Sequence, residues 1–533
     1  MIPNRKKGNL AMATLLVLIA IVLADQARFL FVYPVPDTGM WFGDETWTML
    51  TVRALAQSGV ARVPEALGSS LAHSNGLLNG SIWISGLLYG VPAMLFSNVG
   101  SPVAIGRTVT FALSLVTLFF VYRLARRLGA PETAAWISVL ALVISNAFYF
   151  SSHSARLDII TGLAVLLFFY FLVTAFDRAQ TRTPIARYAF SIPFLVAMSA
   201  AIYVHVPALI GLPALYSLWK MGAFRRWQTV AISIGGFALG AFLLIGTYWM
   251  TTGSFSLLGT GYNQYYNVAN SLPVLHLRSW RVQKINTIDR GLQVWDVAWP
   301  LVIAILIGIA ARVRIWRRGR IVGDDRRPFR DLREHFFFTN SILLILSWGL
   351  FGGPAVFYNV HVLPVAAVCA AVLMGHHLQP LARVFVPLFI AIAVFTIVSQ
   401  ERLGAVGERL VIGNRFAVHS LIDPISSLTH PPLILTDEPA INEIAADPNV
   451  RLMTNHLLLF GSENKPLPEI LRKYRVDYLL LYSTVRWQSP FKHIADSLFT
   501  LVGERTGLLT DQARSYDNPA WNEIDTLRLY KAK

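Results

Sequence analysis

Long apolar runs alternate with short polar segments over residues 1–400. A helix needs roughly 20 apolar residues to cross the hydrocarbon core of a bilayer, and several of these runs have that length. The pattern predicts a polytopic α-helical membrane protein with about 11 transmembrane helices. The expected spans cover residues 10–30, 103–122, 134–150, 159–176, 189–202, 206–219, 228–250, 297–312, 336–351, 362–377 and 384–400.

Two apolar regions do not fit simple spans. A span at 81–97 would place the arginines of 123–127 on the outer side, so an interfacial helix with Trp83 and Tyr89 at headgroup depth fits better. Residues 189–219 have basic residues on both flanks, and about 30 residues form only two half-length helices at a rise of 1.5 Å per residue. We expect a short helical hairpin whose polar tip, Tyr203-Val-His-Val-Pro207, lies below the outer membrane surface and lines a wet cavity.

The pattern changes after residue 400, where short apolar stretches typical of buried strands are separated by helical stretches. The expected strands are 433–436, 450–453, 476–482 and 527–530, and a helix is expected at 467–474. We therefore predict two domains: a transmembrane domain at 1–400 and a small extracytoplasmic α/β domain at 401–533. The second domain lacks a glycine-rich phosphate loop and a nucleophile elbow, which favours a role as a lid or acceptor platform.

The composition agrees with a membrane protein. The chain is 54% hydrophobic and 14% charged, with a mean hydropathy of +0.51, whereas soluble domains carry roughly 25% charged residues. These values exclude an ordinary soluble enzyme, a disordered chain and a fibrous repeat. The single cysteine, Cys369, cannot form an internal disulfide, and its apolar neighbours favour a small core residue.

The net charge of +16 tests the topology. With a cytoplasmic N-terminus and alternating spans, the cytoplasmic segments carry 22 Lys/Arg and 6 Asp/Glu, the outer loops before residue 400 carry 9 and 8, and residues 401–533 carry 15 and 16. The whole positive surplus then lies in the cytoplasm, as the positive-inside rule requires. We expect an uncleaved first span and a periplasmic or extracellular C-terminal domain. The basic cluster at 312–333 then anchors the chain near lipid headgroups, and no nucleic-acid partner is expected.

Candidate chemistry lies among the outer carboxylates. Asp44 and Glu45 are adjacent in the loop after the first span, and Asp158 lies where the fourth span begins. Two carboxylates from different outer loops can converge on a membrane-surface cavity, as acid–base chemistry or metal binding needs. The alternative is structural: Asp44 caps a helix, and Asp158 caps the fourth span or pairs with Arg156.

The order of several short motifs resembles that of a known family. The Asp44-Glu45 loop, the interfacial helix, Tyr122-Arg-Leu-Ala-Arg-Arg-Leu-Gly129 and Ser154-Ala-Arg-Leu-Asp158 follow one another as in the GT-C membrane glycosyltransferases. Within that fold, the chain is most similar to the protein O-mannosyltransferase and lipid A aminoarabinose transferase superfamily, with motif support over residues 1–220. The resemblance implies a bacterial inner-membrane enzyme that passes a sugar from a polyprenyl-phosphate carrier to an extracytoplasmic acceptor, inverting the anomeric centre. It also implies that Asp44 is the general base and Glu45 its partner.

Two stretches depart from the family pattern. Where relatives often have a His-Lys-Pro-Pro-like stretch, this chain has Ala72-His-Ser-Asn-Gly76 and keeps only His73. Where relatives often have Thr-Lys-Gly-Pro at the hairpin tip, this chain places Tyr203 and His205, so a titratable histidine stands where a phosphate-binding lysine is expected. The carrier phosphate is then held either by this histidine or by residues elsewhere in the chain.

The remaining candidate residues are outer-face groups that could bind substrate. The loop at 251–296 carries Arg278, Arg281 and Lys284, which could hold a lipid phosphate or simply contact headgroups. Tyr358 and His361 follow a Gly-Gly-Pro break and could line the same cavity. The outer histidines could bind a divalent cation together with the carboxylates, but their spacing gives no metal motif, so no metal site is assigned.

These observations predict an inverting glycosyltransferase that uses a polyprenyl-phosphate-linked sugar, with an extracytoplasmic lipid, glycan or protein as acceptor. The alternative from another class is a transporter or flippase for a lipid-linked or small polar substrate. Transporters usually show two similar halves and ionisable residues near mid-membrane, and this chain has no obvious internal repeat. A glycolipid-binding protein without catalytic activity is the third interpretation.

Overall fold

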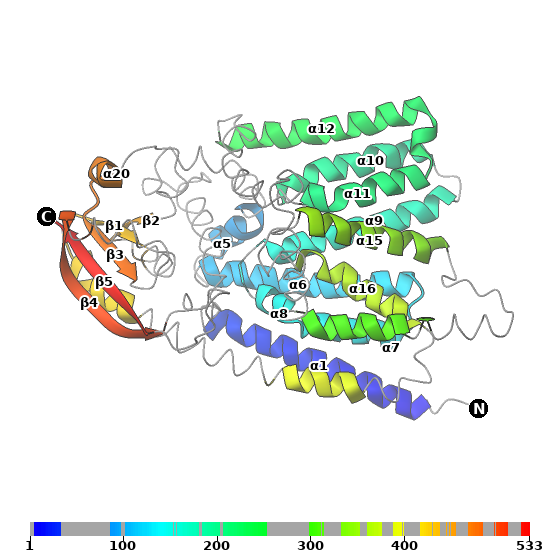
Figure 1. Cartoon of the computed structure of the whole chain (residues 1–533), viewed down its shortest axis with the longest axis horizontal. Coiled ribbons are helices and arrows are strands. Elements are labelled where there is room, and N and C mark those ends of the chain that lie inside the picture. The colour runs from blue at the N-terminus through cyan, green and yellow to red at the C-terminus, as the bar shows by residue number, and fades with distance from the viewer. Residues whose placement is uncertain are drawn as a thin grey trace, which may run out of the picture. The chain divides into compact units, whose positions relative to one another are not determined.

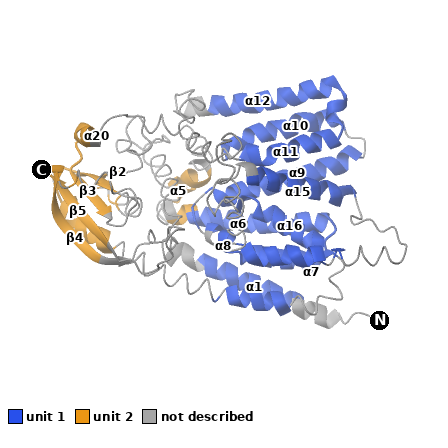
Figure 2. Cartoon of the chain, viewed as in Figure 1, with its two compact units in different colours: residues 1–28, 107–250, 265–400 blue, residues 29–106, 251–264, 401–533 orange. Residues whose placement is uncertain are grey.

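The computed structural model (Figure 1) shows a mainly helical chain with a small sheet near the C-terminus. It describes residues 5–32, 86–96, 102–152, 154–155, 157–180, 184–202, 206–252, 298–310, 312–313, 332–351, 360–375, 387–396, 398, 416–428, 430–436, 444, 447, 449–454, 467–482, 495, 497–509 and 524–533. The chain divides into two compact units (Figure 2). Unit 1 comprises 1–28, 107–250 and 265–400, and unit 2 comprises 29–106, 251–264 and 401–533.

Unit 1 is a bundle of helices. Its members are α1 (Arg5–Val32), α6 (Pro102–Arg127), α7 (Glu132–Val143), α8 (Asn146–Ser152), α9 (Asp158–Gln180), α10 (Ile185–Met198), α11 (Val206–Lys220), α12 (Trp227–Thr252), α15 (Leu332–Phe351) and α16 (Leu363–Met374), with 3₁₀ turns η2 (Ser199–Ala201) and η3 (Ala223–Arg225). Shorter apolar helices cover Ala298–Ala310 and Pro387–Thr396. Each of the predicted apolar spans therefore contains a helix. Among the described residues, three helical segments are long and apolar enough to cross a membrane: Ala104–Arg127, Asp158–Gln180 and Trp227–Thr247. The total number of crossings stays a prediction.

The centre of unit 1 is α9. Its apolar side chains are largely buried all round the helix, as expected for a helix enclosed by others rather than one that faces lipid or water on one side. It packs against α10, α11, α15 and α16, and α16 also packs along α7. Nearly every side chain of α16 is buried. The first residues of α9 and the turn leading into α16 therefore lie inside the bundle.

The predicted helical hairpin is present. Helices α10 and α11 have 14 and 15 residues and pack against each other. At 1.5 Å per residue each is roughly 21–23 Å long, shorter than the hydrocarbon core of about 30 Å. The tip of the hairpin, with Tyr203 and His205, lies outside the described residues.

At one end of unit 1, arginine side chains form ion pairs with carboxylates and hydrogen bonds with backbone carbonyl groups. The Asp177 carboxylate pairs with Arg127 at 3.0 Å and with Arg333 at 2.7 Å, which joins α6, α9 and α15. Arg312 pairs with Glu334 at 3.2 Å and donates to the Val372 carbonyl at the end of α16. Two arginines of the predicted basic cluster therefore have acidic partners within the protein.

The segment expected to be an interfacial helix contains two short helical pieces, a π-helical turn η1 (Gly86–Gly90) and α5 (Val91–Leu95). Tyr89 is fully buried. Its ring therefore packs within the protein, and its depth in the membrane stays a prediction. Met94, Leu95 and Phe96 are exposed apolar residues, and Trp83 lies outside the described residues.

Unit 2 contains a five-stranded sheet of order β2-β1-β3-β5-β4. Its strands are β1 (Leu433–Thr436), β2 (Arg451–Thr454), β3 (Tyr478–Tyr482), β4 (Phe499–Leu509) and β5 (Ile524–Ala532), and α20 (Leu467–Tyr474) precedes β3. β1 pairs in parallel with β2 and β3, in register at Leu433↔Arg451 and Ile434↔Tyr478, and β5 runs antiparallel between β3 and β4. The predicted strands and helix are present, and β4 was not predicted.

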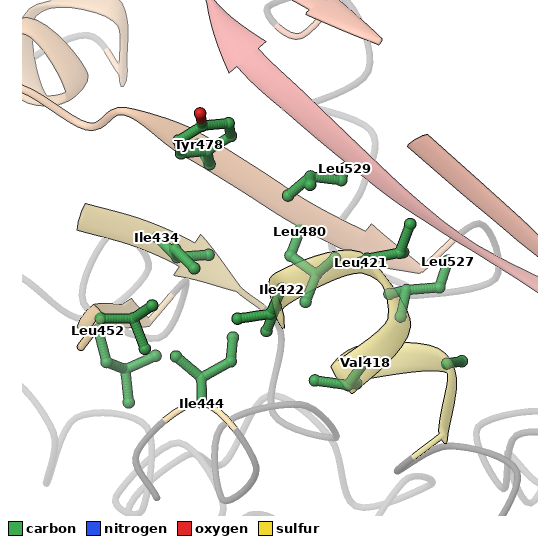
Figure 3. Packing of buried hydrophobic residues seen from close by; sticks show 12 residues of the cluster. Val418, Leu421, Ile422, Ile434, Ile444, Leu452, Tyr478, Leu480, Leu527 and Leu529 are labelled. Carbon is green, nitrogen blue, oxygen red and sulfur yellow. The ribbon is translucent and has the colours of Figure 1, made fainter. Parts of the chain in front are cut away.

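Two apolar clusters stabilise this sheet. One contains Ile434, Leu480 and Leu527 from three strands together with Val418 and Ile422 from the helical segment at 416–426 (Figure 3). The other includes Leu435 and Leu479 with Leu471 of α20. Alternate strand residues therefore enter separate cores, as the twofold side-chain period of a strand requires. Unit 2 also includes residues before 401, so the predicted domain boundary at 400 stays a prediction.

Candidate functional site

Two of the predicted site residues lie within the described part of the chain, Asp158 and His361, and the structure brings them together. The others lie outside the described residues: Asp44, Glu45, His73, Arg156, Tyr203, His205, Arg278, Arg281, Lys284 and Tyr358.

Asp158 is the first residue of α9, and His361 lies in the turn that leads into α16. The His361 Nε2 and the Asp158 Oδ1 are 3.0 Å apart, a hydrogen bond between groups 203 residues apart in sequence. Their side chains are only 3% and 6% exposed. A buried carboxylate needs such a partner, because removal from water otherwise costs several kcal/mol. The pair therefore fixes the carboxylate in one orientation.

The close approach of α9 to this turn depends on Gly162. Gly162 is one helical turn after Asp158, so both residues lie on the same face of α9. A Cβ atom at position 162 would lie 2.7 Å from the Val360 carbonyl oxygen and 3.4 Å from Pro364. The absence of a side chain therefore lets the backbone next to His361 come close to α9, which places His361 within reach of Asp158.

Asp25, near the end of α1, also has a partner. The Tyr149 hydroxyl of α8 donates a hydrogen bond to the Asp25 carboxylate. Tyr149 is buried. Helix α8 packs against both α7 and α9. The hydrogen bond therefore connects α1 to the helix that precedes Asp158 in the chain.

Several polar groups in this part of the bundle are buried without a partner among the described residues. They are both polar atoms of the Gln26 amide, the Ser151 hydroxyl and the Thr161 hydroxyl. Gln26 continues the buried face of α1 that includes Leu15 and Val22. Buried polar groups are nearly always paired, with protein or with ordered water. This end of the bundle is therefore polar inside, as a site for a polar substrate requires.

Within the ranges that the structure covers, no group of three or more His, Cys, Asp or Glu side chains could hold a metal ion. Asp158 accepts a hydrogen bond from His361 when that histidine nitrogen carries a proton. Such a carboxylate can orient a hydroxyl or an adjacent cation.

Sequence reasoning missed Gly162, Asp25 as a partner of Tyr149, and the buried Gln26. Gly162 lies in a long apolar run, where a glycine costs helix stability and usually has a packing reason. That cost is a usable signal for a close contact, although it does not identify the contacting segment. Gln26 continues a buried stripe at helical spacing, so its position in the sequence indicates a buried amide.

Comparison with known proteins shows a relationship at the level of fold. No protein-family profile matches the sequence, and no curated protein sequence matches it. Two solved structures of ArnT from Cupriavidus metallidurans match, one bound to undecaprenyl phosphate and one in the apo state, with a TM-score of 0.51 each. Sequence identity is 13% and 14%, and in both cases the match covers 98% of each chain. The chain therefore has the fold of these ArnT structures, which agrees with the GT-C-like fold that its motifs predicted.

Proposed function

We propose that this protein is a membrane glycosyltransferase that takes a sugar from a polyprenyl-phosphate carrier. The observation that supports this proposal is the fold match to ArnT, which covers 98% of both chains and includes a structure bound to undecaprenyl phosphate. The buried Asp158–His361 pair and the polar interior around it agree with a site for a polar substrate.

In the proposed reaction, an acceptor hydroxyl attacks the anomeric carbon of the sugar from the face opposite the phosphate. A new bond forms between the acceptor oxygen and the anomeric carbon, and the bond between that carbon and the phosphate oxygen breaks. Asp44 takes the proton of the hydroxyl as general base, and the phosphate leaves without strong acid assistance. The sugar is transferred with inversion.

The other carboxylates have supporting roles in this proposal. Asp158, whose side chain is held by His361, orients the sugar or the acceptor. Glu45 assists Asp44, alone or with a bound divalent cation. The carrier phosphate is held by charge-assisted donors from His205 or from the cationic loop with Arg278, Arg281 and Lys284. The remaining candidates, His73, Arg156, Tyr203 and Tyr358, contact the substrates.

The test is the Asp44→Asn variant of the full-length protein, purified and supplied with polyprenyl-phosphate sugars. Asparagine keeps the size of the side chain but removes its basicity, so turnover should fall by roughly 10²–10⁴-fold. Donor binding should be retained, because the phosphate is held elsewhere. Consumption of the lipid-linked sugar, measured with a radiolabelled donor, gives the rate.

A matched control separates base catalysis from a structural role of the loop. Asp37→Asn makes the same change at an aspartate of the same predicted loop to which the proposal gives no role, and it should keep wild-type turnover. If Asp44 only caps a helix, asparagine replaces it well and Asp44→Asn stays active. Wild-type turnover of a folded Asp44→Asn protein would therefore reject the assignment of the base.

A further inference from the structure

The connection between α11 and α12 concentrates positive charge at one end of unit 1. Lys220 ends α11, and Arg225 and Arg226 lie just before α12; all three are exposed. Gly222 has a φ of 80°, a left-handed conformation that glycine adopts without a steric penalty and that lets the chain reverse within a few residues. We call residues 219–227 the basic–aromatic turn.

Aromatic side chains alternate with these cations. Trp219, Phe224 and Trp227 are 62%, 43% and 78% exposed. Trp219 also ends an exposed apolar stripe of α11 at helical spacing, with Leu212 and Leu215. Exposed tryptophans at the end of an apolar helix face are typical of the membrane–water interface, where the ring contacts both acyl chains and headgroups. The exposed tryptophans therefore favour a position of the turn at the depth of lipid headgroups.

The cations of this turn have no acidic partner within the described part of the chain. The sequence contains no Asp or Glu between Asp177 and Asp289. Exposed Arg187 near the start of α10 adds a further positive charge, since α10 contacts η3. By contrast, Arg127 and Arg333 share Asp177 at the ends of neighbouring helices. Asp177 therefore neutralises Arg127 and Arg333. The cations of the basic–aromatic turn can instead bind an anion from outside the protein.

We propose that the basic–aromatic turn is a binding site for the headgroup of an anionic phospholipid of the bilayer. Arginine and lysine donate charge-assisted hydrogen bonds to phosphate oxygens, and the aromatic rings pack on the glycerol and upper acyl region. The charge distribution places this turn on the cytoplasmic side, whereas glycosyl transfer is expected at the outer face. The ligand is therefore a structural phospholipid and not the sugar carrier, and the site is independent of the proposed reaction.

Native mass spectrometry of the full-length protein in neutral detergent tests this site. Phosphatidylglycerol, phosphatidylcholine and undecaprenyl phosphate are titrated separately, and the retained lipid adducts are counted. The test variant combines Lys220→Gln, Arg225→Gln and Arg226→Gln. Each cation near an anionic lipid strengthens binding roughly fivefold, so the variant should lose up to about 100-fold in phosphatidylglycerol affinity. Its affinity for phosphatidylcholine should change little.

A control variant with the same change in net charge combines Arg472→Gln, Lys473→Gln and Arg475→Gln, which are exposed positions at and after α20 in unit 2. It should bind phosphatidylglycerol as the wild type does. Equal losses in the two triple variants would show a general charge effect and overturn the proposal, as would unchanged phosphatidylglycerol binding in the test variant. A larger loss for undecaprenyl phosphate than for phosphatidylglycerol would assign the turn to the carrier and would also overturn it.

Two further measurements do not depend on the triple variant being well folded. Raising the salt concentration should weaken phosphatidylglycerol binding to the wild type and leave phosphatidylcholine binding nearly unchanged. Trp227→Ala should weaken the binding of both lipids to a similar degree, because the ring contacts the glycerol and upper acyl region that both lipids share. Salt-independent binding of phosphatidylglycerol would contradict a site built from these cations.

Discussion

At the scale of single residues, the Asp158–His361 pair depends on a position that has no side chain. Gly162 allows the backbone around Val360 to lie against α9, and a Cβ there would come within 2.7 Å of a carbonyl oxygen. A backbone atom cannot rotate away as a flexible side chain can. Any substitution at 162 therefore has to move the turn that carries His361.

We predict that Gly162→Ala reduces glycosyl transfer by about tenfold or more, because displacement of a positioning group by about 1 Å can cost 10²-fold. The added methyl group overpacks the contact between α9 and Val360, which should also destabilise the protein by about 1–3 kcal/mol. Turnover with a polyprenyl-phosphate sugar and the thermal midpoint in detergent measure the two effects.

Gly211→Ala is the control for this prediction. Gly211 lies in α11, and a Cβ there meets no atom within 4 Å. The control should keep its activity and gain up to about 1 kcal/mol of stability from the better helix propensity of alanine. If Gly162→Ala matched Gly211→Ala in both measurements, the close approach would not support the pair.

The sequence identified both Asp158 and His361 as candidates for one cavity, but it did not predict that they form a pair. Asp158 is recognisable because a carboxylate follows directly on an apolar run and begins the next one. His361 lies 203 residues further on, and its distance from Asp158 is set by the packing of α9 against α16. Such a contact leaves no local pattern of hydrophobic and polar residues. Gly162 likewise looks like any glycine in an apolar helix.

At the scale of elements, α12 is attached to the bundle through glycines. Most of this helix is exposed within unit 1: in its apolar 18-residue stretch, only 17% is buried. Gly236 and Gly240, spaced as in a Gly-x-x-x-Gly motif, face α10: a Cβ at 236 would overlap the Phe190 carbonyl oxygen, and one at 240 would lie 2.9 Å from the Phe194 carbonyl oxygen. Small residues at this spacing let two membrane helices approach closely.

We predict that Gly236→Ala separates α12 from α10 and lowers the thermal midpoint of the protein in detergent. The cost should be about 1–3 kcal/mol, because the clash is with backbone and cannot be relieved by a rotamer change. Gly235→Ala is the matched control, since a Cβ at 235 meets no atom within 4 Å. A lower midpoint in both variants would point to the glycines' effect on the helix itself, and an unchanged midpoint in Gly236→Ala would contradict the packing.

Most elements were predictable because their signals are local. The long apolar runs gave the helices of unit 1, and β1 and α20 were predicted with their observed ends. The apolar run at 134–150 is instead broken at Ile144–Ser145 into α7 and α8, where the Ser145 hydroxyl bonds the Ala141 carbonyl. β4 was missed because its sequence, with Gly503, Glu504 and Arg505 in the middle, lacks a regular alternation and its pairing contains irregularities.

At the scale of the whole molecule, the charge distribution and the fold match both indicate a polytopic membrane protein, and neither observation depends on the other. The positive surplus fits one orientation in the membrane. The fold match extends over 98% of the chain, including the C-terminal region, which contains no family motif. The parts of the candidate site around Asp44 and His205 lie outside the described residues, so their roles depend on the motifs and on the proposed tests.

The orientation itself gives the last prediction. Ser427 and Gln180 are both exposed, the first near the sheet of unit 2 and the second at the end of α9. The charge count places Ser427 outside and Gln180 in the cytoplasm. In intact cells, a membrane-impermeant maleimide should therefore label Ser427→Cys and should label Gln180→Cys only after the membrane is opened. The native Cys369 is buried, so its background labelling should be low, and a Cys369→Ala chain removes it completely. Labelling of Gln180→Cys from outside together with protection of Ser427→Cys would reverse the topology. It would also place Asp158 on the wrong side for an extracytoplasmic acceptor, because Asp158 and Gln180 lie at opposite ends of the same helix.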